Sequence, residues 1–206
     1  MTQTRVYVVD DDSALRRSLQ RILLQAGYQT RGFASGIAFL QFCRALPAGC
    51  VILDWVMPAM DGFEVLKAFT DAGYRWPVIM LTGHAERSTM IRAIRGGSVF
   101  FLEKPVREVE LLGAVLKAEA SLRGTAAAPR DPMIVRSLML LSPQEQAVLE
   151  AMMDGLLNKE IAGLLGMTEG AVKACRRRIR RKIGAKNTTA LTKMALLAGF
   201  PFKSRA

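Results

Sequence analysis

The chain has no long hydrophobic run and few cysteines. Its longest stretch without a charged residue runs from Gly32 to Cys43, twelve residues, whereas a transmembrane helix needs about 18 or more apolar residues. The first residues, Met1 to Arg5, lack the basic, apolar and small-residue order of a signal peptide. The three cysteines form no Cys-x-x-Cys pair and no even disulfide set. We therefore expect a cytoplasmic protein with reduced thiols and no membrane partner.

Acidic residues are also scarce, and the shortage is uneven. The 206 residues carry 29 Lys and Arg against 18 Asp and Glu, a net charge of +11. Residues 1–123 have 15 basic and 12 acidic residues, whereas residues 124–206 have 14 and 6. After residue 123 the only aromatic residues are Phe200 and Phe202, so platforms for stacking single-stranded bases are missing. This distribution predicts a near-neutral module joined to one that binds a polyanion, with duplex DNA favoured.

Strand and helix patterns alternate in the first half of the chain. Short apolar runs predict strands at Val6–Val9, Tyr28–Phe33, Cys50–Leu53, Val78–Leu81 and Val99–Leu102. Helical spacing follows each strand, at about 13–26, 37–46, 61–72, 86–95 and through Val109 to Leu116. Ser13 is the expected cap of the first helix. Continuous apolar strands joined by helices predict a five-stranded parallel sheet that is covered on both faces.

A linker and a run of helices make up the second half. Residues 123–134 include two prolines, a glycine and three alanines, which interrupt any core pattern. Ser142-Pro143-Gln144-Glu145 forms a helix start with a capping box. Four short helices are expected, at about 143–154, 158–165, 169–183 and 189–199, which is typical of a helix-turn-helix domain. We therefore divide the chain into domains 1–121 and 138–206, joined by a linker at 122–137.

Polar side chains follow four of the five predicted strands. In chain order they are Asp10-Asp11-Asp12, Asp54, Thr82 and Lys104. In a sheet of order 2-1-3-4-5 the first and third strands are neighbours, so Asp10, Asp11 and Asp54 should converge. Carboxylate oxygens suit Mg²⁺, and Lys104 and Thr82 can each contact a phosphoryl oxygen. Each residue alone could be a simple helix cap or turn residue, but the ordered set indicates phosphoryl chemistry.

Four segments resemble the receiver domain of response regulators, over about residues 4–121. They are V-V-D-D-D (8–12), I-L-D-W-V-M-P-A-M-D-G (52–62), M-L-T-G-H (80–84) and F-L-E-K-P (101–105). The resemblance implies a flavodoxin-like fold, with Asp54 as the phosphoacceptor and a sensor histidine kinase as the phosphoryl donor. It also implies Mg²⁺ bound by Asp11, Asp54 and the backbone carbonyl of Val56, with Asp10 acting through water.

The same resemblance assigns roles to the later strand ends. Lys104 would pair with the phosphoryl group, next to a cis bond to Pro105. Thr82 and Phe101 would be the switch pair, in which the ring moves when phosphate draws the threonine inward. Such a domain is not an enzyme, because it catalyses only its own phosphorylation and dephosphorylation. His84, the one histidine, could act as a base, although an exposed loop histidine is the simpler interpretation.

Basic residues crowd the third predicted helix of the second half, with no acidic residue among them. They are Lys173, Arg176, Arg177, Arg178, Arg180, Arg181, Lys182 and Lys186. An apolar stripe recurs at helical spacing and should face a core: Val172, Cys175, Ile179 and Ile183. A helix of this width fits the major groove of B-DNA, where cations contact phosphates. A solvated charged face is the structural alternative, but such faces usually mix Lys with Glu.

This half also resembles the LuxR-type helix-turn-helix domain, over about residues 138–200. The matching segments are L-S-P-Q-E-Q-A-V-L (141–149), L-N-K-E-I-A-G-L-L-G-M-T-E-G-A-V-K (157–173) and I-G-A-K-N (183–187). The resemblance places Lys173, Ala174 and Arg177 at the bases. It implies phosphate contacts from Lys159, Lys182 and Lys186, with Asn158 a weaker candidate. The remaining DNA-binding candidates are Arg176, Arg178 and Arg181.

Together the two resemblances identify the NarL/FixJ family of response regulators. They imply a transcription factor that binds promoter DNA, can contact RNA polymerase, and dimerises on phosphorylation through a helix 4–strand 5–helix 5 face. The charges for that face would be Arg87, Arg92, Arg95, Glu108 and Glu110. Two alternatives remain open from the residues alone. One is a Mg²⁺-dependent phosphohydrolase with an aspartyl-phosphate intermediate, and the other is a DNA-binding regulator whose first domain serves only for dimerisation.

Overall fold

The computed structural model describes residues 4–83, 99–124 and 132–198. Contacts within the chain divide it into two compact units, one made of residues 1–106 and 114–128 and the other of residues 107–113 and 129–206. The helix predicted at 86–95 lies outside the described residues. No helix in the described ranges combines the length and the apolar character that crossing a bilayer requires.

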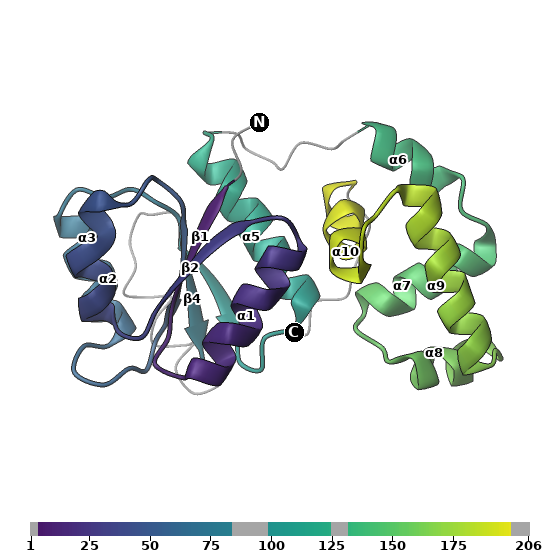
Figure 1. The fold of residues 1–206 in the computed structure, drawn as a ribbon, viewed down its shortest axis with the longest axis horizontal. Coiled ribbons are helices and arrows are strands. Elements are labelled where there is room, and N and C mark those ends of the chain that lie inside the picture. The colour runs from purple at the N-terminus through teal and green to yellow at the C-terminus, as the bar shows by residue number, and fades with distance from the viewer. Residues whose placement is uncertain (1–3, 84–98, 125–131, 199–206) are drawn as a thin grey trace. The chain divides into compact units, whose positions relative to one another are not determined.

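A parallel sheet forms the centre of the first unit (Figure 1). Within the described residues it has five strands in the order β2-β1-β3-β4-β5. The strands are β1 (Arg5–Val9), β2 (Gln29–Phe33), β3 (Cys50–Asp54), β4 (Val78–Thr82) and β5 (Val99–Glu103). Both the α/β class and the predicted strand order are therefore confirmed. Because β1 pairs with β3 from Val6↔Cys50 to Val9↔Leu53, the two strands end at the same level of the sheet.

Helices cover both faces of this sheet. They are α1 (Ser13–Gln25), α2 (Gly36–Phe42), α3 (Gly62–Asp71) and α5 (Glu108–Leu122), with a 3-10 turn at Cys43–Ala45. Phe39 of α2 and Phe69 of α3 are buried in one cluster with Tyr7 of β1, on one face. Leu19 of α1 is buried on the other face, where the part of α5 from residue 114 onward also lies (Figure 1). The hydroxyl of Thr4 donates to Glu119 of α5 at 2.6 Å and so joins this helix to the start of β1.

The cap of α1 differs from the prediction. The carboxylate of Asp12, not the hydroxyl of Ser13, accepts the N–H groups of Ala14 at 2.7 Å and Leu15 at 3.2 Å. Both residue types are good N-caps, so the sequence alone did not decide between neighbours. The capping role directs Asp12 to the helix start, which separates it from the two preceding aspartates.

The second unit is helical. Its helices are α6 (Pro132–Met139), α7 (Pro143–Met153), α8 (Asn158–Leu165), α9 (Glu169–Ile183) and α10 (Thr188–Leu197). The prediction of four helices missed α6, most of which lies in the segment 122–137 interpreted as linker. Ile134 and Leu138 of α6 are buried in the core of this unit, together with Val148, Ile161 and Ile179. Leu138 is the fourth residue after Ile134, so the two side chains lie on one side of a helix despite the nearby prolines.

Candidate functional site

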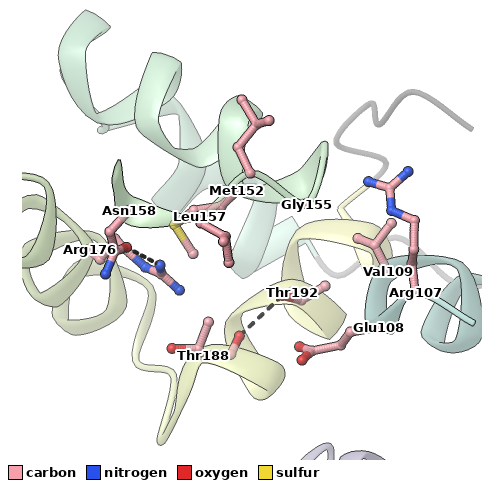
Figure 2. Close-up of a pocket in the computed structure, with 11 residues that line it drawn as sticks. Arg107, Glu108, Val109, Met152, Gly155, Leu157, Asn158, Arg176, Thr188 and Thr192 are labelled. Atoms are coloured by element: carbon pink, nitrogen blue, oxygen red, sulfur yellow. Dashed lines mark hydrogen bonds between the residues drawn. The ribbon is translucent and has the colours of Figure 1, made fainter. Parts of the chain in front are cut away.

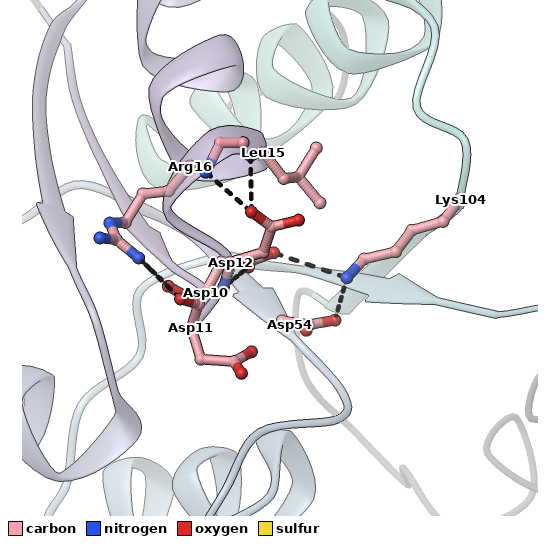
Figure 3. Close-up of polar contacts among 8 residues, drawn as sticks. Asp10, Asp11, Asp12, Leu15, Arg16, Asp54 and Lys104 are labelled. Atoms are coloured by element: carbon pink, nitrogen blue, oxygen red, sulfur yellow. Dashed lines mark hydrogen bonds and ion pairs between the residues drawn. The ribbon is translucent and has the colours of Figure 1, made fainter.

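Three carboxylates meet where β1 and β3 end (Figure 3). One oxygen from each of Asp10, Asp11 and Asp54 lies within 4.8 Å of the others. Asp10 and Asp54 are buried, and Asp11 is exposed. The guanidinium of Arg16 on α1 donates to the backbone carbonyl of Asp10 and helps to fix the turn after β1. The predicted convergence of these three residues is therefore present in the structure.

Lys104 adds the positive charge of the cluster. It follows β5 and precedes a cis peptide bond to Pro105. Its ammonium lies 2.7 Å from Oδ1 of Asp54 and 3.5 Å from Oδ2 of Asp10 (Figure 3). The backbone N–H of Lys104 donates to the carbonyl of Thr82 at 2.8 Å. This hydrogen bond joins the ends of β4 and β5 at Thr82 and Lys104, the two residues predicted to contact the phosphoryl group.

The carboxylates of this cluster are short of positive charge. Burial raises the pKa of Asp10 and of Asp54 above the usual range of an aspartate, even though Lys104 opposes the shift. Burial alone would lower the pKa of Lys104, but its contacts with Asp54 and Asp10 raise it overall. One ammonium therefore compensates two buried carboxylates only in part. A hard divalent cation such as Mg²⁺ would supply the remaining positive charge.

Two buried oxygens at this edge lack hydrogen-bond partners. Oδ1 of Asp10 accepts the N–H of Asp12 at 2.8 Å, whereas the one described contact of Oδ2 of Asp10 is the ammonium of Lys104 at the long distance of 3.5 Å. The hydroxyl of Thr82, which is 1% exposed, has no hydrogen-bond partner within the described part of the chain. Buried polar atoms are nearly always hydrogen-bonded in folded proteins. The two atoms therefore fit a site that completes its bonds with a hydrated cation and an anionic oxygen.

The loop after β3 returns close to Asp54. Val56 is 61% exposed at its start, and the N–H of Gly62 donates to the carbonyl of Trp55 at 2.8 Å. A Cβ atom at Gly62 would lie 2.3 Å from the carbonyl oxygen of Asp54, which is closer than real Cβ contacts. Only glycine allows this approach without a shift of the backbone. Gly62 therefore positions the loop that carries Val56.

The predicted switch residues lie on neighbouring strands. Met80 of β4 pairs with Phe101 of β5, and Thr82 is two residues beyond Met80, so Thr82 and Phe101 face the same side of the sheet. The ring of Phe101 is half-buried against the cluster that includes Phe69. His84 lies outside the described residues. The side chains of Thr82 and Phe101 therefore project from the same face of the sheet on adjacent strands.

The basic face belongs to α9. The hydroxyl of Thr168 caps this helix by accepting the N–H of Ala171 at 3.1 Å, and Gly184 ends it with a φ of 77°. The predicted inward stripe is buried: Val172, Cys175, Ile179 and Ile183. Exposed cations occupy much of the remaining surface: Lys173, Arg177, Arg178, Arg181 and Lys182. Cys175 is a core residue, as predicted.

Further basic candidates lie around α9. Lys159 in the first turn of α8 and Lys186 after Gly184 are both exposed. Arg176 is half-buried, and its guanidinium donates to Oδ1 of Asn158 at the start of α8 (Figure 2). Burial lowers the pKa of Arg176. Because arginine stays protonated regardless, the contact with α8 rather than its charge distinguishes Arg176 from its neighbours.

Comparison with known proteins agrees with this arrangement. The family model of the response regulator receiver domain matches residues 6–116, and that of the luxR family of bacterial regulatory proteins matches residues 139–195. Nodulation protein W of Bradyrhizobium diazoefficiens is 35% identical over 199 residues, which cover 96% of this chain and 88% of that protein. Transcriptional regulatory protein FixJ of Rhizobium meliloti is 34% identical over 201 residues, which cover 97% and 98%. The chain is a response regulator of the NarL/FixJ family.

A solved structure supports the same assignment. Full-length FixJ from B. japonicum is 32% identical, with a TM-score of 0.53, and the match covers 98% of this chain and 100% of that one. The response regulator therefore combines a receiver domain with a LuxR-type helix-turn-helix domain, and it is a DNA-binding transcription regulator of a two-component system. It is not a typical enzyme.

One contact of α9 in this response regulator was not predicted from the sequence, and it is made by Glu145. Glu145 was recognised only as part of a capping box at the start of α7, and the structure confirms that box. Its carboxylate also lies 2.7 Å from the ammonium of Lys182 and 3.7 Å from Nε of Arg178, both on α9. The sequence marks Glu145 only as a capping-box residue, and its partners on α9 lie more than 30 residues further along the chain. Local patterns do not reveal such pairs.

Proposed function

We propose that Asp54 accepts a phosphoryl group from a sensor histidine kinase. The observation that carries this proposal is the cluster at the carboxyl edge, where oxygens of Asp10, Asp11 and Asp54 lie within 4.8 Å of one another. Mg²⁺ would be held by Asp11, Asp54 and the backbone carbonyl of Val56, with Asp10 acting through water. The buried Oδ2 of Asp10 supports this arrangement, because its one described contact is the ammonium of Lys104 at 3.5 Å and a hydrated cation would give it a closer partner.

The phosphoryl transfer needs few protein groups. A carboxylate oxygen of Asp54 attacks phosphorus in line and forms a P–O bond, while the bond from phosphorus to the donor's histidine nitrogen breaks and its electron pair leaves with the imidazole. When bound, Mg²⁺ neutralises charge on the phosphoryl oxygens. The ammonium of Lys104, already 2.7 Å from Asp54, contacts one phosphoryl oxygen, and the hydroxyl of Thr82 donates to another. Thr82 then draws inward and Phe101 follows.

The second unit supplies the output. We propose that α9 enters the major groove of promoter DNA, with Lys173, Ala174 and Arg177 at the bases. Exposed cations outside the base-facing set would contact phosphates, as predicted for Lys159 and Lys186. A DNA partner implies that the protein works in the cytoplasm, with RNA polymerase as a further partner.

Phosphorylation would couple the two units by dimerisation through a helix 4–strand 5–helix 5 face. Glu108 and Glu110, two of the predicted interface charges, lie in the first turn of α5. The others, Arg87, Arg92 and Arg95, lie outside the described residues. A symmetric dimer would present two copies of α9 to successive half-sites of an operator.

Intact mass spectrometry tests the phosphoacceptor. We expect the full chain to gain one phosphoryl group when it is incubated with Mg²⁺ and a small phosphodonor. The adduct should be absent in Asp54→Ala and in the presence of EDTA. Asp71→Asn is the matched control, because Asp71 is a surface aspartate paired with Lys67 at 3.5 Å, and this variant should gain the group normally.

Other outcomes would favour the alternatives. Turnover of small phosphate esters beyond self-dephosphorylation would indicate a phosphohydrolase. Equal promoter activation by Asp54→Asn and the parent chain would indicate a receiver that serves only for dimerisation. Operator affinity of residues 132–206, a segment that retains α6, against the full chain then separates two modes of control. If the isolated segment binds no better than the unphosphorylated chain, occlusion of the DNA-binding surface is excluded, and effective concentration in the dimer explains the control.

A further inference from the structure

The basic residues of α9 have different environments. At about 100° per residue, Arg177 and Arg181 lie opposite the buried stripe of α9. Both are largely solvent-exposed, and neither has an ion-pair partner among the described residues. Arg178 and Lys182 lie on a flank of the helix next to that stripe. On this flank they meet a buried acidic residue of another helix.

That acidic residue is Glu145 in the first turn of α7. It is 3% exposed, and its Oε2 accepts the backbone N–H of Ser142 at 2.8 Å. The same oxygen lies 2.7 Å from the ammonium of Lys182, and Oε1 lies 3.7 Å from Nε of Arg178. The carboxylate is therefore shared between the start of its own helix and two cations of α9.

The charge balance makes this contact important for the fold. A buried carboxylate is costly unless it is hydrogen-bonded and paired. The hydrogen bonds from Lys182 and from the N–H of Ser142 hold the pKa of Glu145 below the usual range of a glutamate. Lys182 also lies 3.4 Å from the carbonyl of Leu140, just before α7. Its ammonium is thus held by two acceptors of the protein.

From these contacts we propose that Glu145 is a positioning residue that keeps Arg178 and Lys182 on α7 and away from DNA phosphates. The pair then fixes how α9 packs on α7, while the outward cations, Arg177 and Arg181 among them, contact DNA. This inference rests on the proposed binding of duplex DNA by α9. It reassigns two of the residues that the sequence suggested for DNA binding.

The salt dependence of DNA binding distinguishes cations that contact phosphates from cations that are held by Glu145. Each phosphate contact made by a cation adds about one to the slope of log affinity against log salt concentration. The probe is a short labelled duplex of mixed sequence, bound by the full chain with and without a small phosphodonor. We expect Arg181→Met, which removes an exposed cation outside the base-facing set, to reduce the magnitude of the slope by about one. Lys182→Met should leave the slope unchanged and lower the melting temperature.

Two further variants separate positioning from loss of structure. Lys182→Arg retains a cation beside Glu145 and should recover most of the melting temperature, again with an unchanged slope. Glu145→Gln keeps the shape of the side chain and releases Arg178 and Lys182, so the slope should rise by about one or more. A slope whose magnitude falls by about one in Lys182→Met, as in Arg181→Met, would overturn the inference.

A failure of the proposed function would look different. If the parent chain showed no salt-dependent binding to the duplex in either state, DNA binding by α9 would be wrong, and the inference would fall with it. If the parent bound DNA and Lys182→Met lost slope as a phosphate contact would, the proposed function would stand, and only the positioning role of Glu145 would be rejected.

Discussion

The two charged sites of this response regulator are built in opposite ways. In the receiver unit, three carboxylates and one lysine converge from the ends of three strands, and two of the carboxylates, Asp10 and Asp54, are buried. In the helical unit, the cations follow one another along a single helix and are mostly exposed. Charge in a buried site is weakly screened, whereas charge on a surface is strongly screened by salt. Removing one charge should therefore have very different consequences in the two places.

The largest expected effect comes from Lys104→Met. This change removes the one cation within 4 Å of Asp54 in the described residues, at a place where it would stabilise the transferring phosphoryl group. We expect phosphorylation to slow by about a hundredfold or more, as measured by the time course of the phosphoryl adduct in intact mass spectra. Arg177→Met, which removes an exposed cation of α9 instead, should leave this rate unchanged. Equal rates in Lys104→Met and the parent would remove Lys104 from the mechanism.

A smaller effect, of unusual sign, is expected from Thr82→Val. The hydroxyl of Thr82 is buried without a hydrogen-bond partner among the described residues, so an apolar group of the same shape should raise the free energy of unfolding of the receiver unit by about 1 kcal/mol. Urea unfolding would measure this change. Thr192→Val is the matched control, because the buried hydroxyl of Thr192 donates to the carbonyl of Thr188 at 3.2 Å (Figure 2). That variant should be destabilised, and destabilisation of Thr82→Val would show that its hydroxyl has a partner at rest.

The smallest expected effect is the loss of the stabilisation by Glu145 at acidic pH. The pKa of Glu145 is lowered in the fold, chiefly by the hydrogen bond from Lys182. Its stabilisation is therefore complete above the unfolded value, about 4.3, and is lost as pH falls through the lower folded value. We expect the stability difference between the parent and Glu145→Gln to be constant near neutral pH and to shrink in that acidic window. Thermal melts across the pH range test this expectation, and a difference that stayed constant into acid would contradict it.

The same contrast explains what the sequence could predict. The receiver site was predictable because parallel strands bring their carboxyl ends to one edge, so the order of residues along the chain determines which side chains meet. The positions of Asp10, Asp54 and Lys104 needed no further information. The environment of the α9 cations was not predictable in this way. Helical spacing correctly gave the buried stripe, but it does not say which neighbouring helix supplies a partner, and Glu145 lies 37 residues from Lys182.

Two further differences have local causes. Most of α6 was interpreted as linker because two prolines, a glycine and three alanines interrupt residues 123–134. The structure shows instead that Ile134 and Leu138 are both buried in the helical core. Burial of a short apolar stripe by tertiary packing overcame the weak local pattern. The cap of α1 was assigned one residue too late, because adjacent Asp and Ser both favour that position. Neither difference changes the site, since Asp12 contacts the helix start rather than the carboxylate cluster.

Gly62 shows that a position without any reacting atom can be constrained as strictly as a catalytic one. The space that its missing side chain leaves is occupied by the carbonyl oxygen of Asp54, so even a methyl group there displaces the residue that would carry the phosphoryl group. A survey that ranks positions by reactivity would pass over Gly62. An engineer who redesigns this regulator for a new input should treat it as fixed, whereas the exposed Val56 a few residues earlier is open to change.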